Sequence, residues 1–218
     1  MKRIILFPVS SNCESLFPKL EPVKLRYTVA PDYIEKDDLI LFAGGTDVDP
    51  EFYGEKLGSY SGRPDHQRDA FERSVFELYP NNPKLGICRG SQFLNVMNGG
   101  KLAQDVTGHA IHGTHPIDTV DGRRIQVTST HHQMMIPSPK GKLIAWASGQ
   151  SLHYLDGDNK DVWGPRLGID DRGRNMEPEI VFYPNTKSLC IQGHPEYLDP
   201  NADFWQYTCE LARKYLGV

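Results

Sequence analysis

The sequence has no long hydrophobic stretch and no run of positive charge. The apolar run Ile4–Val9 contains a proline and is too short for a signal peptide, and no segment approaches the ~20 apolar residues that span a bilayer. No more than two Lys or Arg residues are adjacent in the 218-residue chain, whose formal net charge is −4. Because phosphate binding depends on clustered cations, we expect no nucleic acid partner. These absences predict a cytoplasmic protein that does not contact membranes.

Cysteine is scarce and scattered. The four cysteines are Cys13, Cys88, Cys190 and Cys209, and no two of them form a C-x-x-C pair. This spacing argues against zinc ribbons and thioredoxin-like redox chemistry. Without a secretory signal we expect free thiols rather than disulfides. Most free thiols fill space in a core, so only a special local context would identify a reactive one.

Three histidines recur in the segment GHAIHGTHP, residues 108–116. His109, His112 and His115 could suggest metal binding, but the segment offers no acidic or cysteine fourth ligand and contains glycines and a proline. We interpret the segment as a loop. No metal site and no cofactor are expected.

The pattern of apolar residues predicts alternating strands and helices. In the first half we expect strands at Lys2–Val9, Lys24–Val29, Asp38–Phe42 and Lys84–Ile87, and helices at Gln67–Tyr79 and Ser91–Met97. This order is typical of a mainly parallel sheet with helices on both faces. Strands of antiparallel character follow at Arg124–Thr130, Leu143–Ala147, Ser151–Leu155 and Ile180–Tyr183, before a buried strand at Leu189–Gln192 and a helix at Ala202–Leu216. We expect one α/β domain spanning residues 1–218, with an antiparallel excursion from the parallel sheet.

Cys88 has the special context that the other cysteines lack. It lies in the frame Gly86-Ile87-Cys88-Arg89-Gly90, directly after a predicted buried strand and before a predicted helix. This is the cysteine counterpart of a nucleophile elbow, in which flanking glycines allow the chain to pass close by on both sides. A helix N-terminus favours the thiolate, and the Arg89 N–H would point toward a developing oxyanion. The alternative is a structural cysteine in a glycine-rich turn.

Two further segments could complete a catalytic site. The strand Leu39–Phe42 runs into Ala43-Gly44-Gly45, and either glycine could supply a second oxyanion N–H at the carboxyl edge of the sheet. The strand Leu189–Gln192 runs into Gly193-His194-Pro195-Glu196. His194 could serve as the base for Cys88, and Glu196 could orient its ring, which gives a nucleophile–base–orienter triad.

Five segments resemble one family in their order along the chain. They are LFAGGTDVDPEFYGE (41–55), Arg68-Asp69 with Glu72, LGICRGSQFLNVMNGGKLAQDV (85–106), STHHQ (129–133) and QGHPE (192–196). The chain resembles class I glutamine amidotransferase-like domains, and more narrowly the γ-glutamyl hydrolase branch (peptidase C26-like) that includes γ-glutamyl-γ-aminobutyrate hydrolases. Gly193 departs from the bulky residue usual before the final histidine, and Asp158–Met176 has no counterpart in the family pattern.

The resemblance implies both a fold and a set of site residues. The implied fold is a flavodoxin-like, mainly parallel sheet flanked by helices, with an antiparallel excursion. The implied triad is Cys88, His194 and Glu196, with an oxyanion hole from the N–H groups of Gly45 and Arg89. The resemblance also places Gln92, His131 and His132 beside a glutamyl group.

Three functions fit this pattern. The first is hydrolysis of a small-molecule γ-glutamyl amide through a thioester on Cys88. The second is a glutaminase subunit that acts on glutamine and supplies ammonia to a separate synthetase partner. The third is a pseudoenzyme or binding module on the same fold, which the presence of Cys88, His194 and Glu196 disfavours. The stretch D-x-D-P-x-x-Y-G (47–54) and the Arg68-Asp69 pair favour the hydrolase.

Overall fold

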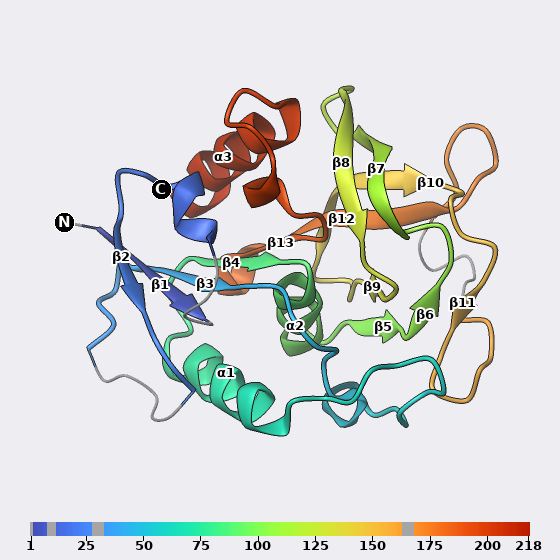
Figure 1. Ribbon diagram of the computed structural model, residues 1–218, viewed down its shortest axis with the longest axis horizontal. Coiled ribbons are helices and arrows are strands. Elements are labelled where there is room, and N and C mark those ends of the chain that lie inside the picture. The colour runs from blue at the N-terminus through green and yellow to red at the C-terminus, as the bar shows by residue number, and fades with distance from the viewer. Residues whose placement is uncertain (1, 8–11, 28–32, 163–167) are drawn as a thin grey trace.

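A mixed β-sheet forms the centre of the protein. The computed structural model describes residues 2–7, 12–27, 33–162 and 168–218. In these ranges nine strands pair in the order β2-β1-β3-β4-β13-β12-β10-β7-β8 (Figure 1). The first five are parallel to one another: β2 (Glu21–Lys24), β1 (Arg3–Phe7), β3 (Leu39–Phe42), β4 (Lys84–Ile87) and β13 (Ser188–Ile191). This order, in which the second strand lies outside the first, is that of flavodoxin-like sheets.

The antiparallel half of the sheet continues from β13. It consists of β12 (Met176–Tyr183), β10 (Lys142–Ser148), β7 (Ala110–Thr119) and β8 (Arg124–Thr130). Two short pairs lie beside it: β5 (Lys101–Ala103) with β9 (Met134–Ile136), and β6 (Asp105–Val106) with β11 (Tyr154–Leu155). The structure thus has the predicted mainly parallel sheet with an antiparallel excursion.

Helices cover both faces of the parallel strands (Figure 1). The helices α1 (His66–Leu78) and α2 (Arg89–Met97) pack with one buried apolar cluster, and α3 (Asp203–Leu216) packs with another on the opposite face. Because both faces are covered, β1, β3, β4 and β13 are buried almost throughout, as is usual for parallel sheets. Among the described residues no helix has the length and apolarity needed to cross a membrane. The 3₁₀ helices are Cys13–Leu16, Pro50–Tyr53, Pro184–Thr186 and Pro195–Tyr197.

Two strand predictions were wrong in position, and one loop prediction was wrong in kind. The second strand is Glu21–Lys24 rather than Lys24–Val29, a range that ends outside the described residues. Of Ser151–Leu155 only Tyr154–Leu155 is a strand. The segment predicted as a loop around His109–Pro116 is largely the strand β7. Its proline is tolerated because β10 pairs with β7 only at Asp118 and Thr119, which leaves the N–H edge of Pro116 without a neighbouring strand there.

Candidate active site

Cys88 occupies a strained turn between β4 and α2. Its backbone angles are φ 51° and ψ −113°, which side-chain-bearing residues rarely adopt. The Cys88 N–H donates to the Ile191 carbonyl at 2.8 Å, and the Cys88 carbonyl accepts the N–H groups of Ser91 and Gln92. These bonds hold the thiol at the N-terminus of α2, where the helix dipole favours negative charge.

The glycines that flank Cys88 are required by close backbone contacts. A Cβ on Gly90 would lie 1.9 Å from the Phe42 carbonyl oxygen, and a Cβ on Gly86 would lie 2.4 Å from the Gly90 carbonyl oxygen. Both obstacles are backbone atoms, which cannot rotate away. The elbow therefore depends on glycine at these two positions, as the sequence predicts.

We expect Gly90→Ala to destabilise the protein by about 3 kcal/mol or more, because the added methyl group overlaps the β3 backbone. For a chain of this size, that loss corresponds to a drop in Tm of roughly 6–12 °C. Gly113→Ala is the matched control, since a Cβ there meets its nearest neighbour at 3.8 Å. Equal Tm values for the two variants in a thermal melt would contradict the tight elbow.

His194 is held at the end of β13 by three contacts. Its Nδ1 lies 2.7 Å from Glu196 Oε1, and its backbone N–H donates to Thr128 Oγ1 at 2.6 Å. The Tyr197 ring stacks on the imidazole at a centroid distance of 4.5 Å. Glu196 takes the position from which a carboxylate can orient the ring and stabilise its charged form.

The electrostatic environment favours a protonated His194. Burial disfavours a charged imidazole, but hydrogen bonds to the Cys88 sulfur and to Glu196 outweigh this effect and raise the pKa of His194 to about 10. A protonated imidazole next to the cysteine can serve as an acid toward a leaving group.

Gly44 lies where the ends of three neighbouring strands meet. A Cβ on Gly44 would lie 2.8 Å from His194 Cε1 and 3.7 Å from Cys88 Cβ, so both side chains line the space beside this glycine. Within the described ranges the N–H groups of Gly45 and Arg89 have no hydrogen-bond acceptor. Free N–H groups at the carboxyl edge of a sheet are suited to binding an oxyanion.

A buried network of charged side chains connects this glycine turn to the elbow. The Arg89 guanidinium pairs with Asp69 and Glu72, and Arg68 Nε donates to Glu72 Oε1 at 2.8 Å. Arg68 also donates to the Ala43 and Gly44 carbonyls, at 2.7 and 3.0 Å. The network therefore fixes the relative positions of β3, α1 and α2. In the sequence, Arg68, Asp69 and Glu72 match the family pattern, but their spacing gives no sign of this structural role.

The predicted substrate-binding residues do not all face the same space. Gln92 is buried in α2, with its amide donating to the Gln133 carbonyl at 3.1 Å. His132 is partly exposed, and a hydrogen bond to Asp47 raises its pKa. His131 is buried and its Nε2 points toward Glu179 at 3.5 Å. The side chains of the adjacent residues His131 and His132 therefore have different partners, Glu179 and Asp47.

Gly193 departs from the family pattern for a packing reason. A Cβ there would lie 2.9 Å from the Phe204 ring and 3.0 Å from the Thr128 carbonyl oxygen. A bulky residue would not fit between α3 and β8 in this chain.

Sequence reasoning missed two buried acidic residues, Glu177 and Glu179 in β12. A signal was available: two carboxylates alternate within a strand whose other residues are mostly apolar. Charged residues are almost never fully buried unless they are paired. The segment Asp158–Met176, which has no counterpart in the family pattern, is described only in part, because residues 163–167 lie outside the described ranges.

Comparisons with known proteins identify the fold. A glutamine amidotransferase from Thermotoga maritima has the same fold, with a TM-score of 0.54 at 15% identity over 99% of this chain and 93% of that one. The fold is that of class I glutamine amidotransferase-like domains. The glutamine amidotransferase-like protein YvdE of Lactococcus lactis subsp. lactis is 44% identical over 168 residues, covering 76% of this chain and 68% of that protein.

The family follows from the sequence match. The Peptidase C26 family model matches residues 16–154, and the chain belongs to this family. A carbamoyl phosphate synthase small chain of Xanthomonas campestris pv. campestris is 43% identical over 81 residues, 37% of this chain and 20% of that protein. The protein is therefore a cysteine hydrolase of the glutamine amidotransferase type, which acts on amide bonds.

Proposed function

We propose that the protein hydrolyses the amide bond of γ-glutamyl compounds, with Cys88 as nucleophile, His194 as acid and base, and Glu196 as the residue that orients His194. The observation that carries this proposal is the pairing of a strained cysteine at a helix N-terminus with a histidine whose other nitrogen is 2.7 Å from a carboxylate. Nucleophile, base and orienting group in this order define a triad.

The residues suggest a sequence of two half-reactions. The Cys88 thiolate attacks the γ-carbonyl carbon, and the Gly45 and Arg89 N–H groups bind the resulting oxyanion. The carbon–nitrogen bond then breaks as His194 donates its proton to the leaving amine, which leaves a γ-glutamyl thioester. Neutral His194 next removes a proton from water, hydroxide attacks the thioester, and glutamate leaves with regeneration of the thiolate and imidazolium. We further propose that Gln92 and His132 contact the glutamyl group.

A second function is favoured by one comparison. A relative is the small chain of carbamoyl phosphate synthase, and this supports a role as a subunit that acts on glutamine beside a separate synthetase. The chemistry at Cys88 would be the same in both functions. They differ in whether the natural leaving group is ammonia or a larger amine.

Turnover of a matched panel of amides separates the two functions. The panel contains glutamine, γ-glutamyl amides of several primary amines, and the corresponding α-glutamyl amides, with glutamate release as the readout. We expect kcat/KM for at least one γ-glutamyl amine to exceed that for glutamine by about tenfold, a difference of ~1.4 kcal/mol in transition-state binding. Exclusive turnover of glutamine would favour the subunit function. Equal turnover of α- and γ-glutamyl amides would contradict both.

A further inference from the structure

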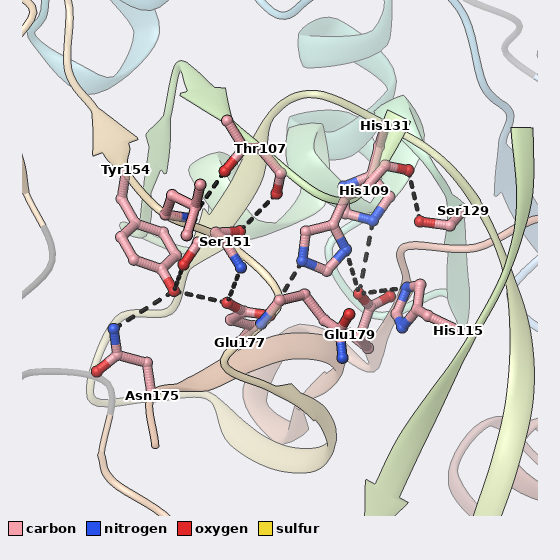
Figure 2. A network of polar contacts seen from close by, with 12 residues as sticks. Thr107, His109, His115, Ser129, His131, Ser151, Tyr154, Asn175, Glu177 and Glu179 are labelled. Carbon is pink, nitrogen blue, oxygen red and sulfur yellow. Dashed lines mark hydrogen bonds and ion pairs between the residues drawn. The ribbon is translucent and has the colours of Figure 1, made fainter. Parts of the chain in front are cut away.

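Four buried side chains converge outside the candidate active site (Figure 2). His109 precedes β7, His115 lies in it, His131 follows β8, and Glu179 lies in β12. Each of the four residues is 3% exposed or less. One potential ligand atom from each lies within 4.8 Å of all the others. The cluster therefore joins three strands of the antiparallel half at one point.

The atoms at the centre of the cluster have no hydrogen-bond partner in the described part of the chain. They are His109 Nδ1, His115 Nε2, His131 Nε2 and both carboxylate oxygens of Glu179. Buried polar atoms are nearly always hydrogen-bonded in folded proteins. Five such atoms facing one another require something to satisfy them.

Each of the three histidines has an inner ring nitrogen, which points to the centre of the cluster, and an outer one, which points away from it. The outer nitrogen of each ring faces an oxygen that carries no proton. These contacts are His109 Nε2 to Glu177 Oε2 (3.0 Å), His131 Nδ1 to the Gln133 carbonyl (2.9 Å) and, longer, His115 Nδ1 to the Pro116 carbonyl (3.4 Å). The outer nitrogen must be the donor in each contact, so the inner nitrogen of a neutral ring presents a lone pair. Such outer partners are typical of histidines that bind metal ions.

The distances between side chains at the centre of the cluster fit a bound metal ion better than they fit direct hydrogen bonds. The inner nitrogens of His109, His115 and His131 lie 3.3, 3.3 and 3.5 Å from one oxygen of Glu179. Charge-assisted hydrogen bonds between nitrogen and oxygen are shorter, about 2.7–2.9 Å. Four ligands that each lie about 2.0–2.1 Å from a tetrahedral zinc ion are separated by about 3.3–3.4 Å.

We infer that His109, His115, His131 and Glu179 bind one divalent transition-metal ion, with Zn²⁺ as the best match. Three imidazoles and one carboxylate suit zinc, whereas Mg²⁺ and Ca²⁺ prefer six or more oxygen ligands. The ion would also compensate the buried charges of Glu177 and Glu179, whose ion pairs among the described residues involve only histidine. Four protein ligands in a buried position define a structural rather than a catalytic site.

The ion would stabilise a wall of the candidate active site. Through His131 it would fix the segment whose Gln133 carbonyl accepts from Gln92 in α2. The Glu179 carbonyl accepts the N–H of Gln192, two residues before His194. Binding of the metal is independent of which amide the protein cleaves, so this inference and the proposed function can fail separately.

Metal content of the whole protein tests the inference. The wild-type protein is produced in zinc-containing medium and dialysed, and its metal content is measured by inductively coupled plasma mass spectrometry. We expect about one zinc ion per chain. Replacement of zinc by Co²⁺ should give the intense visible absorption of a tetrahedral cobalt site. Chelation should lower Tm by roughly 10 °C, and added Zn²⁺ should restore it.

Variants identify the ligands. Glu179→Gln and His115→Gln should each lose the metal, whereas the control His112→Asn changes an exposed histidine of the same strand and should keep it. If either ligand variant fails to fold, titration of the chelated wild-type protein with Zn²⁺ still decides the question. Wild-type protein that holds no metal and shows no change in Tm with Zn²⁺ would overturn the inference. Full metal content in folded Glu179→Gln protein would do the same.

Discussion

Replacement of Cys88 by serine is expected to lower kcat/KM by at least ~10⁴-fold while Tm stays within about 2 °C of the wild-type value. A serine hydroxyl has the same shape as the thiol but is not ionised beside His194, so the nucleophile is lost. The fold should persist because the neighbouring backbone bonds, such as Cys88 N–H to the Ile191 carbonyl, do not involve the side chain. The measurement is glutamate release from a γ-glutamyl amide.

Cys209→Ser is the matched control, since this thiol is also only partly buried but lies in α3. It should retain wild-type turnover. A brief treatment with a thiol alkylator should modify Cys88 first, because Cys13 and Cys190 are buried and burial raises the pKa of the Cys190 and Cys209 thiols. Wild-type activity in Cys88→Ser, or faster labelling of another cysteine in peptide maps, would disprove the assignment.

His194→Ala is expected to cost about 10⁴-fold in kcat/KM, because the proton carrier for both half-reactions is removed. Glu196→Gln should cost less, since the amide can still orient the ring but no longer stabilises its charge. The double variant should be little worse than His194→Ala, because nothing is left to orient. His66→Ala, which changes an exposed histidine, is the control and should leave turnover unchanged. Fully additive losses would mean that Glu196 acts independently of His194.

The His194–Glu196 pair also predicts how kcat/KM depends on pH. The folded-state pKa of His194 is raised to about 10, so the ring is protonated below that pH and can protonate the leaving amine. The value of kcat/KM should therefore fall as pH rises through about 10. Glu196→Gln removes one group that raises this pKa, so the alkaline fall should move to lower pH. An alkaline limb at the same pH in both proteins would exclude the Glu196 contribution.

The sequence predicts the parallel core and the elbow because both depend on local patterns. Lys84–Ile87 is a strand as predicted, and the need for glycine at Gly86 and Gly90 follows from contacts that any strand–helix elbow makes. The role of the Gly44 turn is less visible in the sequence. Its position depends on Arg68, which reaches across from α1 to two backbone carbonyls.

The antiparallel half shows why other features escape sequence reasoning. Glycines and a proline suggested a loop at residues 108–116, whereas pairing with β8 makes most of it a strand. In the sequence, the three histidines of that segment form a local metal motif that lacks a fourth ligand. The fold instead separates His112 from the other two and adds His131 and Glu179, from 16 and 64 residues beyond His115. Such a long-range arrangement has no signature in local spacing.

Direct detection of a γ-glutamyl thioester on Cys88 tests the central claim most directly. The wild-type protein is mixed with a γ-glutamyl anilide, whose good leaving group makes deacylation the slow step, and the reaction is quenched in acid. Mass spectrometry of the peptides should then show the mass of one γ-glutamyl group on the peptide that contains Cys88, and none in Cys88→Ser. Rapid anilide turnover with no acylated peptide, or with the acyl group on another residue, would contradict the proposed mechanism.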